Sequence, residues 1–365
     1  MQEVIVIGAG VVGSAVAYGL ARQGLSVTLL DEGDRALRAS RGNFGLVWCQ
    51  GKGFGAPAYA DITARSCREW PGFAEQLQAE TGIDVEYDNR GGLYFYFDAA
   101  GRDARQQRLS AVQQQAAEAL PFSLLDREQL LETLPDLGPE VLGASFCPLD
   151  GTCDPLKLLY ALLSAARRQG VSHRTRCRAN RILVGQDQRL EVETTAGTLK
   201  ADKVVIAAGL DSDRLAGQVG LKVPLEPVRG QIMVSARQPE RLALPSLQVR
   251  QTREGTIICG DSHEHVGEDC GTTVEVMQAI AQRAVRIYPF LADIQVNRAW
   301  GALRIMTPDG LPLYEQAPMH PGIFNVSCHS GITLAAFHAN QLANCIADGQ
   351  LPASLASFRG DRFDV

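Results

Sequence analysis

The chain has 365 residues, of which 45% are hydrophobic and 21% are charged, and its formal net charge is −6. Such a composition supplies a sizeable apolar core, so a disordered or fibrous chain is excluded. The acidic balance argues against a nucleic-acid-binding protein, since the densest basic stretch, residues 173–178, is short and typical of the solvated face of a strand.

The nine cysteines are widely spaced, their number is odd, and no Cys-x-x-Cys pair occurs. Iron–sulfur clusters, zinc ribbons and disulfide scaffolds are therefore not expected, and no metal site is predicted. The sequence also contains no recognisable signal peptide and no run of about 20 apolar residues. We expect a cytoplasmic protein without a transmembrane segment.

The first predicted unit, residues 3–31, is a strand, a glycine-rich turn, a helix and a second strand. Residues 4–7 form a short apolar run, typical of a strand buried on both faces, and residues 26–30 form the second strand. Two parallel strands joined so closely imply a right-handed crossover. The turn between them, residues 8–13, reads Gly-x-Gly-x-x-Gly, which is the dinucleotide-binding pattern.

Each glycine of this turn has its own physical reason. Gly8 permits the tight turn, Gly10 lets the backbone approach a pyrophosphate, and Gly13 lets the helix pack closely on the strand. The free N–H groups at the start of the helix, including that of Val12, would face the phosphates.

Two acids follow the second strand. Asp31 stands where a carboxylate can accept hydrogen bonds from a ribose, and Glu32 comes next. A solvated loop acid is the alternative interpretation of Asp31. The motif by itself does not separate NAD from FAD.

Apolar periodicity and turn residues predict the remaining elements. Helices are expected at residues 59–81, 102–120, 154–170 and 272–287 and from Ile332 onward, and strands at residues 84–87, 92–97, 203–209 and 323–327. A loop is expected around residues 301–312.

The order of these elements predicts an α/β fold class. We expect a Rossmann-like domain that binds the dinucleotide, and a second, mainly antiparallel β domain for the substrate, built from two insertions. The first domain is assigned residues 1–85, 146–225 and 299–365, and the second is assigned residues 86–145 and 226–298.

Four further segments follow one another in a characteristic order. They are residues 39–45 (ASRGNFG), 204–209 (VVIAAG), 300–304 (WGALR) with 307–312 (TPDGLP), and 329–334 (HSGITL). Together they resemble the glycine oxidase / D-amino-acid oxidase class of FAD-dependent oxidoreductases, and the resemblance covers nearly the whole chain. A nicotinamide dehydrogenase is disfavoured by these flavin-type segments.

The resemblance implies an FAD-binding Rossmann-like domain and noncovalent FAD, because no cysteine lies near residues 300–309, where relatives attach the flavin. It assigns to the cofactor the loop residues Ser40, Arg41, Asn43, Phe44 and Gly45, the turn residues Ala208 and Gly209, and the residues Arg304, Ser330, Gly331, Ile332 and Thr333. The last three would begin the final helix, whose N–H groups favour negative charge on a reduced flavin.

Two residues are assigned to catalysis. In the resembling enzymes an arginine in the segment of Arg304 clamps the substrate carboxylate, and the alternative is an ion pair with an acid such as Asp309. His329 is interpreted as a substrate-side group, a flavin-side group or a packed loop residue. Cys328 stands where the family commonly has glycine, and Lys52 is interpreted as solvated, lining the site or meeting a partner.

Other tempting features receive a structural interpretation. We expect Arg229 to support the strand that carries it, and residues 94–97 to be sheet core, with one tyrosine lining the pocket as the alternative. His263 and His265 are not expected to bind a metal, because no third ligand is evident.

The implied activity is oxidation of the C–N bond of a small amino acid or secondary amine, such as D-hydroxyproline, D-proline, glycine, sarcosine or an opine, by hydride transfer to flavin N5. Residues 40–53 and 328–331 are most similar to β subunits of opine oxidase, D-hydroxyproline dehydrogenase and hydrogen cyanide synthase.

This similarity implies a catalytic component of a dehydrogenase complex whose partners carry a second flavin and an iron–sulfur cluster, and through which the chain would lie peripheral to the inner membrane. The alternatives are a stand-alone oxidase that produces peroxide and a noncatalytic FAD-bearing electron-transfer subunit.

Overall fold

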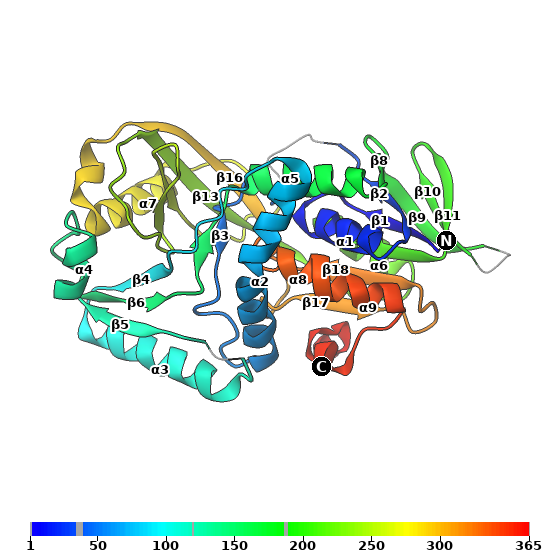
Figure 1. Ribbon diagram of the computed structural model, residues 1–365, viewed down its shortest axis with the longest axis horizontal. Coiled ribbons are helices and arrows are strands. Elements are labelled where there is room, and N and C mark those ends of the chain that lie inside the picture. Colours follow the sequence, from blue (N-terminus) through cyan, green and yellow to red (C-terminus); the bar gives the residue numbers. More distant parts are fainter. Residues whose placement is uncertain (1, 34–38, 119, 186–188, 365) are drawn as a thin grey trace.

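The computed structural model describes residues 2–33, 39–118, 120–185 and 189–364. Residue 119, inside the helix expected at residues 102–120, lies outside the described residues. Figure 1 shows two lobes side by side, with the mainly parallel sheet and a small antiparallel sheet in the right lobe and two other antiparallel sheets in the left lobe.

The right lobe is organised by a six-stranded sheet of order β17-β18-β12-β1-β2-β8. Its central strand β1 pairs in parallel with β2 on one side and β12 on the other, and the edge strand β17 is antiparallel to β18. The strands are β1 Glu3–Ile7, β2 Ser26–Leu30, β8 Ser172–Arg174, β12 Lys203–Ile206, β17 Leu313–Gln316 and β18 Ile323–Ser327.

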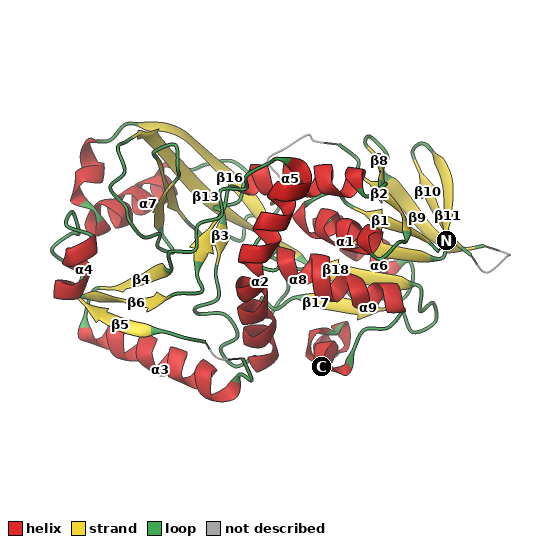
Figure 2. Ribbon diagram, in the orientation of Figure 1, coloured by secondary structure: helices red, strands yellow, loops and turns green. Residues whose placement is uncertain are grey.

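Both faces of this sheet are covered, because successive side chains of a strand point to opposite faces. Val4 and Val6 join the apolar cluster of the helices α1 Val11–Arg22 and α5 Pro155–Arg168. Ile5 and Ile7 join a second cluster, formed with a three-stranded sheet (β9 Ala179–Val184, β10 Leu190–Thr194, β11 Gly197–Ala201) and α6 Ser212–Gly217. Figure 2 shows the resulting layers of helices, parallel sheet and smaller sheet.

The left lobe holds the two expected β insertions around one apolar core. Leu93 and Phe95 of the first insertion pack with Met233 and Ile257 of the second and with Ile287. One sheet contains β4 Gly92–Tyr96, β5 Ser123–Asp126 and β6 Gly143–Cys147, and the other contains β13 Glu226–Arg237, β14 Val249–Gln251, β15 Thr256–Gly260 and β16 Val296–Met306. The residue boundaries of the two domains stay a prediction.

The remaining elements connect and cover these sheets. They are β3 Leu46–Val47, β7 Gly151–Thr152, α2 Pro57–Thr81, α3 Ala99–Gln115, α4 Arg127–Thr133, α7 Val274–Ile287, α8 Ala335–Phe337 and α9 Ala343–Asp348, the π-helical turn η3 His338–Leu342, and the 3-10 turns η1 Gly209–Asp211, η2 Pro289–Asp293, η4 Ala353–Phe358 and η5 Gly360–Phe363.

Several expected elements differ from the structure. The helix expected at residues 102–120 is α3, which ends at Gln115, and the strand expected at residues 203–209 ends at Ile206. Residues 84–87 are not a strand, since Glu86 has a left-handed φ of 54° that breaks an extended run. Residues 301–306 are not a loop, because they belong to β16 and pair along β13. The final helix begins at Ala335 rather than Ile332, so residues 331–334 form a turn before it.

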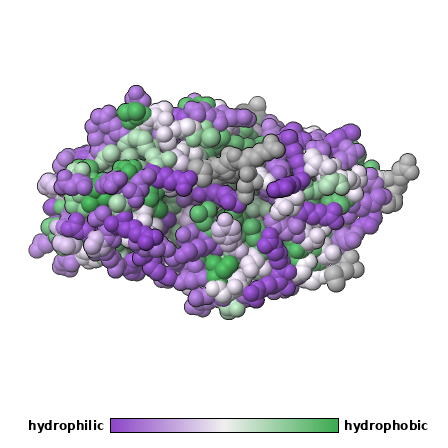
Figure 3. All heavy atoms as spheres, turned by 90° about the horizontal axis from the view of Figure 1, so that it is seen from above, coloured by the Kyte–Doolittle hydropathy of each residue, from purple (hydrophilic) through white to green (hydrophobic). Residues whose placement is uncertain are grey.

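None of the described helices is both long enough and apolar enough to span a bilayer. Seen from above, the surface in Figure 3 is mostly hydrophilic, and its hydrophobic side chains lie in separate patches.

Candidate functional site

The turn after β1 has the shape of a dinucleotide cradle. Gly8 has a φ of +106°, and a Cβ there would lie 2.3 Å from the carbonyl oxygen of Ala207. A Cβ on Gly13 would lie 1.9 Å from the carbonyl oxygen of Gly8, so α1 packs against the turn only because this residue is glycine. Two of the three predicted glycine roles are therefore visible in the geometry of the turn itself.

Asp31 and Ser40 complete the cradle from two other segments. The Asp31 carboxylate accepts hydrogen bonds from the backbone N–H groups of Ala9 (3.0 Å) and Gly33 (2.8 Å). The Ser40 hydroxyl accepts from the N–H of Val11 at 3.0 Å, at the start of α1. Residues that are far apart in the sequence thus surround the positive end of one helix, where a phosphate is favoured.

A cavity of about 530 Å³ opens over this cradle. Eight of the predicted cofactor residues line it, namely Gly8, Gly10, Val12, Asp31, Glu32, Ser40, Ala208 and Gly209. Sequence reasoning missed other lining residues, among them Arg178, Leu303, Ile305, Glu268 and the exposed Cys270. Added Cβ atoms would disrupt this cradle, and a cavity lies beside it. Both features fit the adenosine and diphosphate of FAD, which these residues would hold.

Arg41, Asn43 and Phe44 are, among the described residues, outside the lining of this cavity. The Asn43 side chain accepts from the N–H of Gly45 at 2.8 Å and so shapes its own loop. The Phe44 carbonyl accepts from the Arg250 Nε at 2.6 Å. All three residues stay predictions as cofactor ligands, and in the structure Asn43 and Phe44 hold the loop.

The turn at residues 331–334 joins the cradle to the loop after β3. The Gly331 backbone is so close to α1 that a Cβ would lie 2.9 Å from Val12 Cγ2. The Thr333 hydroxyl accepts from the N–H of Trp48 at 3.1 Å and donates to the Leu46 carbonyl at 3.3 Å. The N–H of Leu334 donates to the Ser330 carbonyl at 3.0 Å, so the donors of the turn toward a cofactor are the backbone N–H groups of residues 331–333.

Lys52, His329 and Ser330 form a compact polar cluster beside this turn. The Lys52 Nζ lies 3.2 Å from His329 Nε2 and donates to the Ser330 hydroxyl, which is 2.7 Å from the Tyr59 hydroxyl. Burial first, and then the charges of Lys52 and Arg304, hold the pKa of His329 well below its ordinary value. His329 is therefore neutral, with Nε2 accepting from Lys52. The interpretation of Lys52 as a solvated lysine is wrong.

Arg304 lies on β16 opposite Val228 of β13, and its guanidinium binds an acid that the sequence did not predict as its partner. It donates to the Asp261 carboxylate at 2.5 Å and to the Ser262 carbonyl at 2.7 Å. A Cβ on Gly230 would lie 2.5 Å from Arg304 Nη1, so the glycine makes room for the guanidinium. The alternative for Arg304, an ion pair with an acid such as Asp309, is thus met by Asp261, whereas Asp309 binds Arg362 at 2.7 Å.

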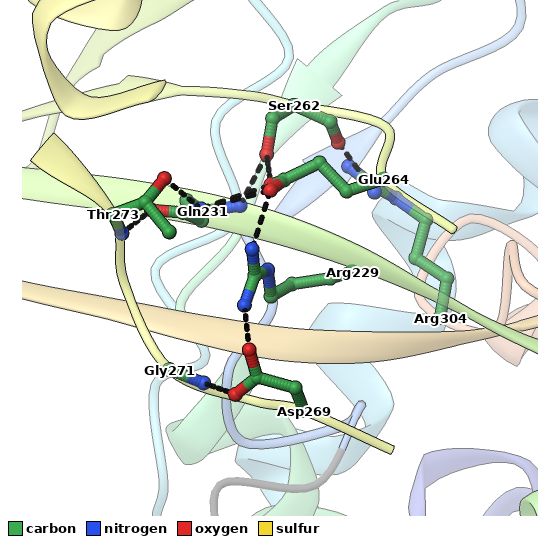
Figure 4. A network of polar contacts seen from close by, with 8 residues as sticks. All are labelled: Arg229, Gln231, Ser262, Glu264, Asp269, Gly271, Thr273 and Arg304. Carbon is green, nitrogen blue, oxygen red and sulfur yellow. Dashed lines mark hydrogen bonds and ion pairs between the residues drawn. The ribbon is translucent and has the colours of Figure 1, made fainter. Parts of the chain in front are cut away.

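Arg229 anchors the same loop from the neighbouring strand, as Figure 4 shows. Its guanidinium pairs with Glu264 at 2.6 Å and with Asp269 at 2.5 Å, and the Arg229 side chain is only 3% exposed. Gln231 donates to the Glu264 carboxylate at 3.0 Å. This network supports the structural interpretation of Arg229, and it fixes the loop that carries Asp261 and Ser262.

A second cluster brings together residues that the sequence keeps far apart. Cys49 Sγ and Cys147 Sγ are 3.5 Å apart, and their sulfurs lie within 4.8 Å of a carboxylate oxygen of Asp150, all of them buried. Asp150 Oδ1 accepts from the Cys49 N–H at 2.6 Å, whereas Oδ2 has no hydrogen-bond partner in the described part of the chain. Burial raises the pKa of Asp150 to about 6. The absence of a metal stays a prediction.

A glycine cradle at the end of a parallel sheet, a cavity over it and an arginine on a facing antiparallel sheet together define a dinucleotide-dependent oxidoreductase. Residues 3–345 match the family of FAD dependent oxidoreductases, and the chain belongs to this family.

Known proteins agree with this assignment. An opine oxidase subunit from Agrobacterium tumefaciens (strain Ach5) is 39% identical over 369 residues, which cover 99% of this chain and 97% of the relative. Glycine oxidase of Pseudomonas putida is 28% identical, over 92% of this chain and 91% of the relative. The crystal structure of glycine oxidase from Geobacillus kaustophilus shares the fold, with a TM-score of 0.89 and 24% identity over 98% of both chains.

These findings confirm the α/β fold class, the resemblance to glycine and opine oxidases, and the use of FAD. The protein is an FAD-dependent oxidoreductase of amino acids or amines.

Proposed function

We propose that the protein oxidises the C–N bond of a small amino acid or secondary amine that carries a carboxylate beside the amine. The observation that carries this proposal is the half-buried guanidinium of Arg304 on β16, whose neighbours Leu303 and Ile305 line the cavity over the glycine cradle. His329 in turn precedes the turn at residues 331–334, which contacts the start of α1. A carboxylate on Arg304 would therefore place the neighbouring C–H bond near the cofactor end of the site.

In the proposed reaction the residues of this chain orient the substrate and add no further positive charge beside its amine. FAD, when bound, supplies the acceptor for a hydride. Arg304 holds the substrate carboxylate through the donors that Asp261 and Ser262 leave free. His329 stays neutral and adds no positive charge beside the amine, which binds in its neutral form. Catalysis then comes mainly from orientation and fixed dipoles.

We further propose that the chain acts as the catalytic component of a dehydrogenase complex. The opine oxidase relative supports this role, because it is named as one subunit and so implies at least one other. Electrons would leave through partners that carry a second flavin and an iron–sulfur cluster, with no metal in this chain. The glycine oxidase relatives support the alternative of a stand-alone oxidase that produces peroxide. The cytoplasmic location, peripheral to the inner membrane through partners, is part of the same proposal.

Anaerobic reduction of the bound flavin tests the chemistry. Glycine, sarcosine, D-proline, D-hydroxyproline and an opine are each mixed with the purified protein, and bleaching of the flavin absorbance is recorded. At least one should bleach it rapidly in the wild type and slowly in Arg304→Lys, which keeps the charge but loses the planar fork. Flavin that none of these compounds reduces would contradict the proposed reaction.

Reoxidation of the reduced protein tests the complex. A component of a dehydrogenase should react sluggishly with O₂ and rapidly with an artificial acceptor. Fast formation of stoichiometric peroxide by the isolated chain would instead establish the stand-alone oxidase.

A further inference from the structure

Lys52 is held in place more firmly than a surface lysine. It lies between Gly51 and Gly53, whose left-handed φ values of +86° and +74° give its loop a fixed shape. Its ammonium group contacts the Ser330 hydroxyl and His329 Nε2 and lies 5.7 Å from the centre of the Tyr59 ring. A hydroxyl, an imidazole nitrogen and an aromatic face form a receptor for a cation.

The receptor is itself buried. Tyr59 is 3% exposed and Ser330 is 6% exposed, so the cation has exchanged much of its water for fixed protein groups. No carboxylate among the described residues forms an ion pair with Lys52. A cation that is partly buried without a neutralising acid keeps its field available to other groups nearby.

Two contacts define where this field acts. The N–H of Trp48 donates to Thr333 at 3.1 Å, which ties the loop of Lys52 to the turn at residues 331–334. The Lys52 ammonium group lies 3.2 Å from His329 Nε2 and donates to the hydroxyl of Ser330, the residue that precedes this turn. Lys52 is thus the cation beside the turn, whereas Arg304 lies on β16.

We propose that Lys52 is a positioning residue of the reaction site: it fixes His329 with Nε2 as an acceptor, and its uncompensated charge, together with the N–H groups of residues 331–333, stabilises the negative charge that reduction places on FAD. The proposal rests on the proposed function, because it requires the flavin ring to lie beside this turn. It gives Lys52 a role in setting the reduction potential rather than in binding substrate.

Three variants separate charge from packing. Lys52→Met removes the charge, Lys52→Gln retains a donor for Ser330 and His329 without the charge, and Lys52→Arg retains the charge. Lys222→Met is the matched control, because Lys222 is an exposed lysine that pairs with Asp364 at 2.6 Å. FAD content is measured first, from the flavin released on denaturation.

The decisive measurement is the equilibrium of bound FAD with a redox dye, which needs no substrate. In Lys52→Met and Lys52→Gln the ratio of reduced to oxidised flavin at a fixed dye potential should fall about tenfold, as for the loss of one nearby charge in a partly buried site. Lys52→Arg and Lys222→Met should stay close to the wild type. If Lys52→Met does not fold, Lys52→Gln gives the answer.

The proposal is overturned if both uncharged variants keep FAD and the wild-type ratio, or if they change only KM for the substrate. Bleaching of wild-type flavin by substrate is recorded separately. A wild type that binds FAD but is bleached by no amine would remove the proposed function, whereas a wild-type ratio in the uncharged variants would remove only the role of Lys52.

Discussion

The guanidinium of Arg304 and the carboxylate of Asp261 form an ion pair with a distance of 2.5 Å, which joins the last residues of β16 to the loop that follows β15. The pair is intermediate in exposure, with 23% of the Arg304 side chain and 35% of the Asp261 side chain accessible. A substrate carboxylate must therefore share or displace Asp261 on the arginine that the sequence assigns to it.

The first prediction concerns Asp261. Asp261→Asn should bind acetate, a simple carboxylate, about 3–10-fold more tightly than the wild type, because it removes a competing negative charge while keeping an acceptor for Arg304. Acetate binding is measured from the perturbation of the flavin absorbance. Arg304→Ala is the opposing variant and should lose about 2–5 kcal/mol of this interaction. Equal acetate affinity in all three proteins would remove Arg304 from the carboxylate site.

The second prediction contrasts two glycines. Gly13→Ala should purify with little FAD, since its Cβ would lie 1.9 Å from the Gly8 carbonyl oxygen and force α1 away from the cradle. Gly72→Ala is the control: it lies in α2, where an added Cβ meets nothing within 4 Å, and should stabilise the protein by about 0.5–1 kcal/mol. FAD content and thermal unfolding are measured for both. Full FAD content in a folded Gly13→Ala protein would contradict the assigned cradle.

The third prediction concerns the buried acid of the thiol cluster. Asp150→Asn should stabilise the protein at pH 8 by about 1–3 kcal/mol, because asparagine keeps the acceptor for the Cys49 N–H without the cost of a buried charge. The folded pKa of about 6 lies above the unfolded value, so the wild type loses stability as pH rises through this window. The advantage of Asp150→Asn in urea unfolding should therefore shrink from pH 6 toward pH 4, and an advantage independent of pH would contradict this explanation.

The fourth prediction concerns His338, whose pKa burial lowers to about 3. The His338 imidazole binds a proton near pH 6.5 in the unfolded chain but not in the folded chain. The free energy of unfolding should therefore fall as pH drops from 6.5 toward 3. This residue alone contributes up to about 1.4 kcal/mol per pH unit in that window. His338→Gln keeps a partner for the Tyr314 hydroxyl, which lies 2.9 Å from His338 Nε2, and should show a smaller loss of stability between pH 7.5 and pH 5. The same pH dependence in both proteins would assign the acid sensitivity to other groups.

The sequence predicts well wherever local chemistry decides the structure. The unit at residues 3–31 was predictable because its glycines and apolar strands act within one short segment. The strand at residues 323–327 was predictable for the same reason.

Long-range pairing limited the remaining predictions. Residues 301–306 carry turn-like neighbours but form β16, because β13 offers them a paired edge. Asp261 and Lys52 gave no local signal of their partners, since the contacts join residues 43 and 277 positions apart. The glycines on both sides of Lys52 were the available hint that its loop is built to a fixed shape.

The loop held by Arg229 also carries a natural attachment site for a fluorescent label. Among the nine cysteines, all of which lie in described segments, Cys270 is the most exposed, and it lines the cavity over the glycine cradle. Cys345 is half-buried and the other seven are buried, so a thiol-reactive fluorophore should label Cys270 before any other cysteine of the native chain. Its emission would then follow cofactor uptake and release in real time.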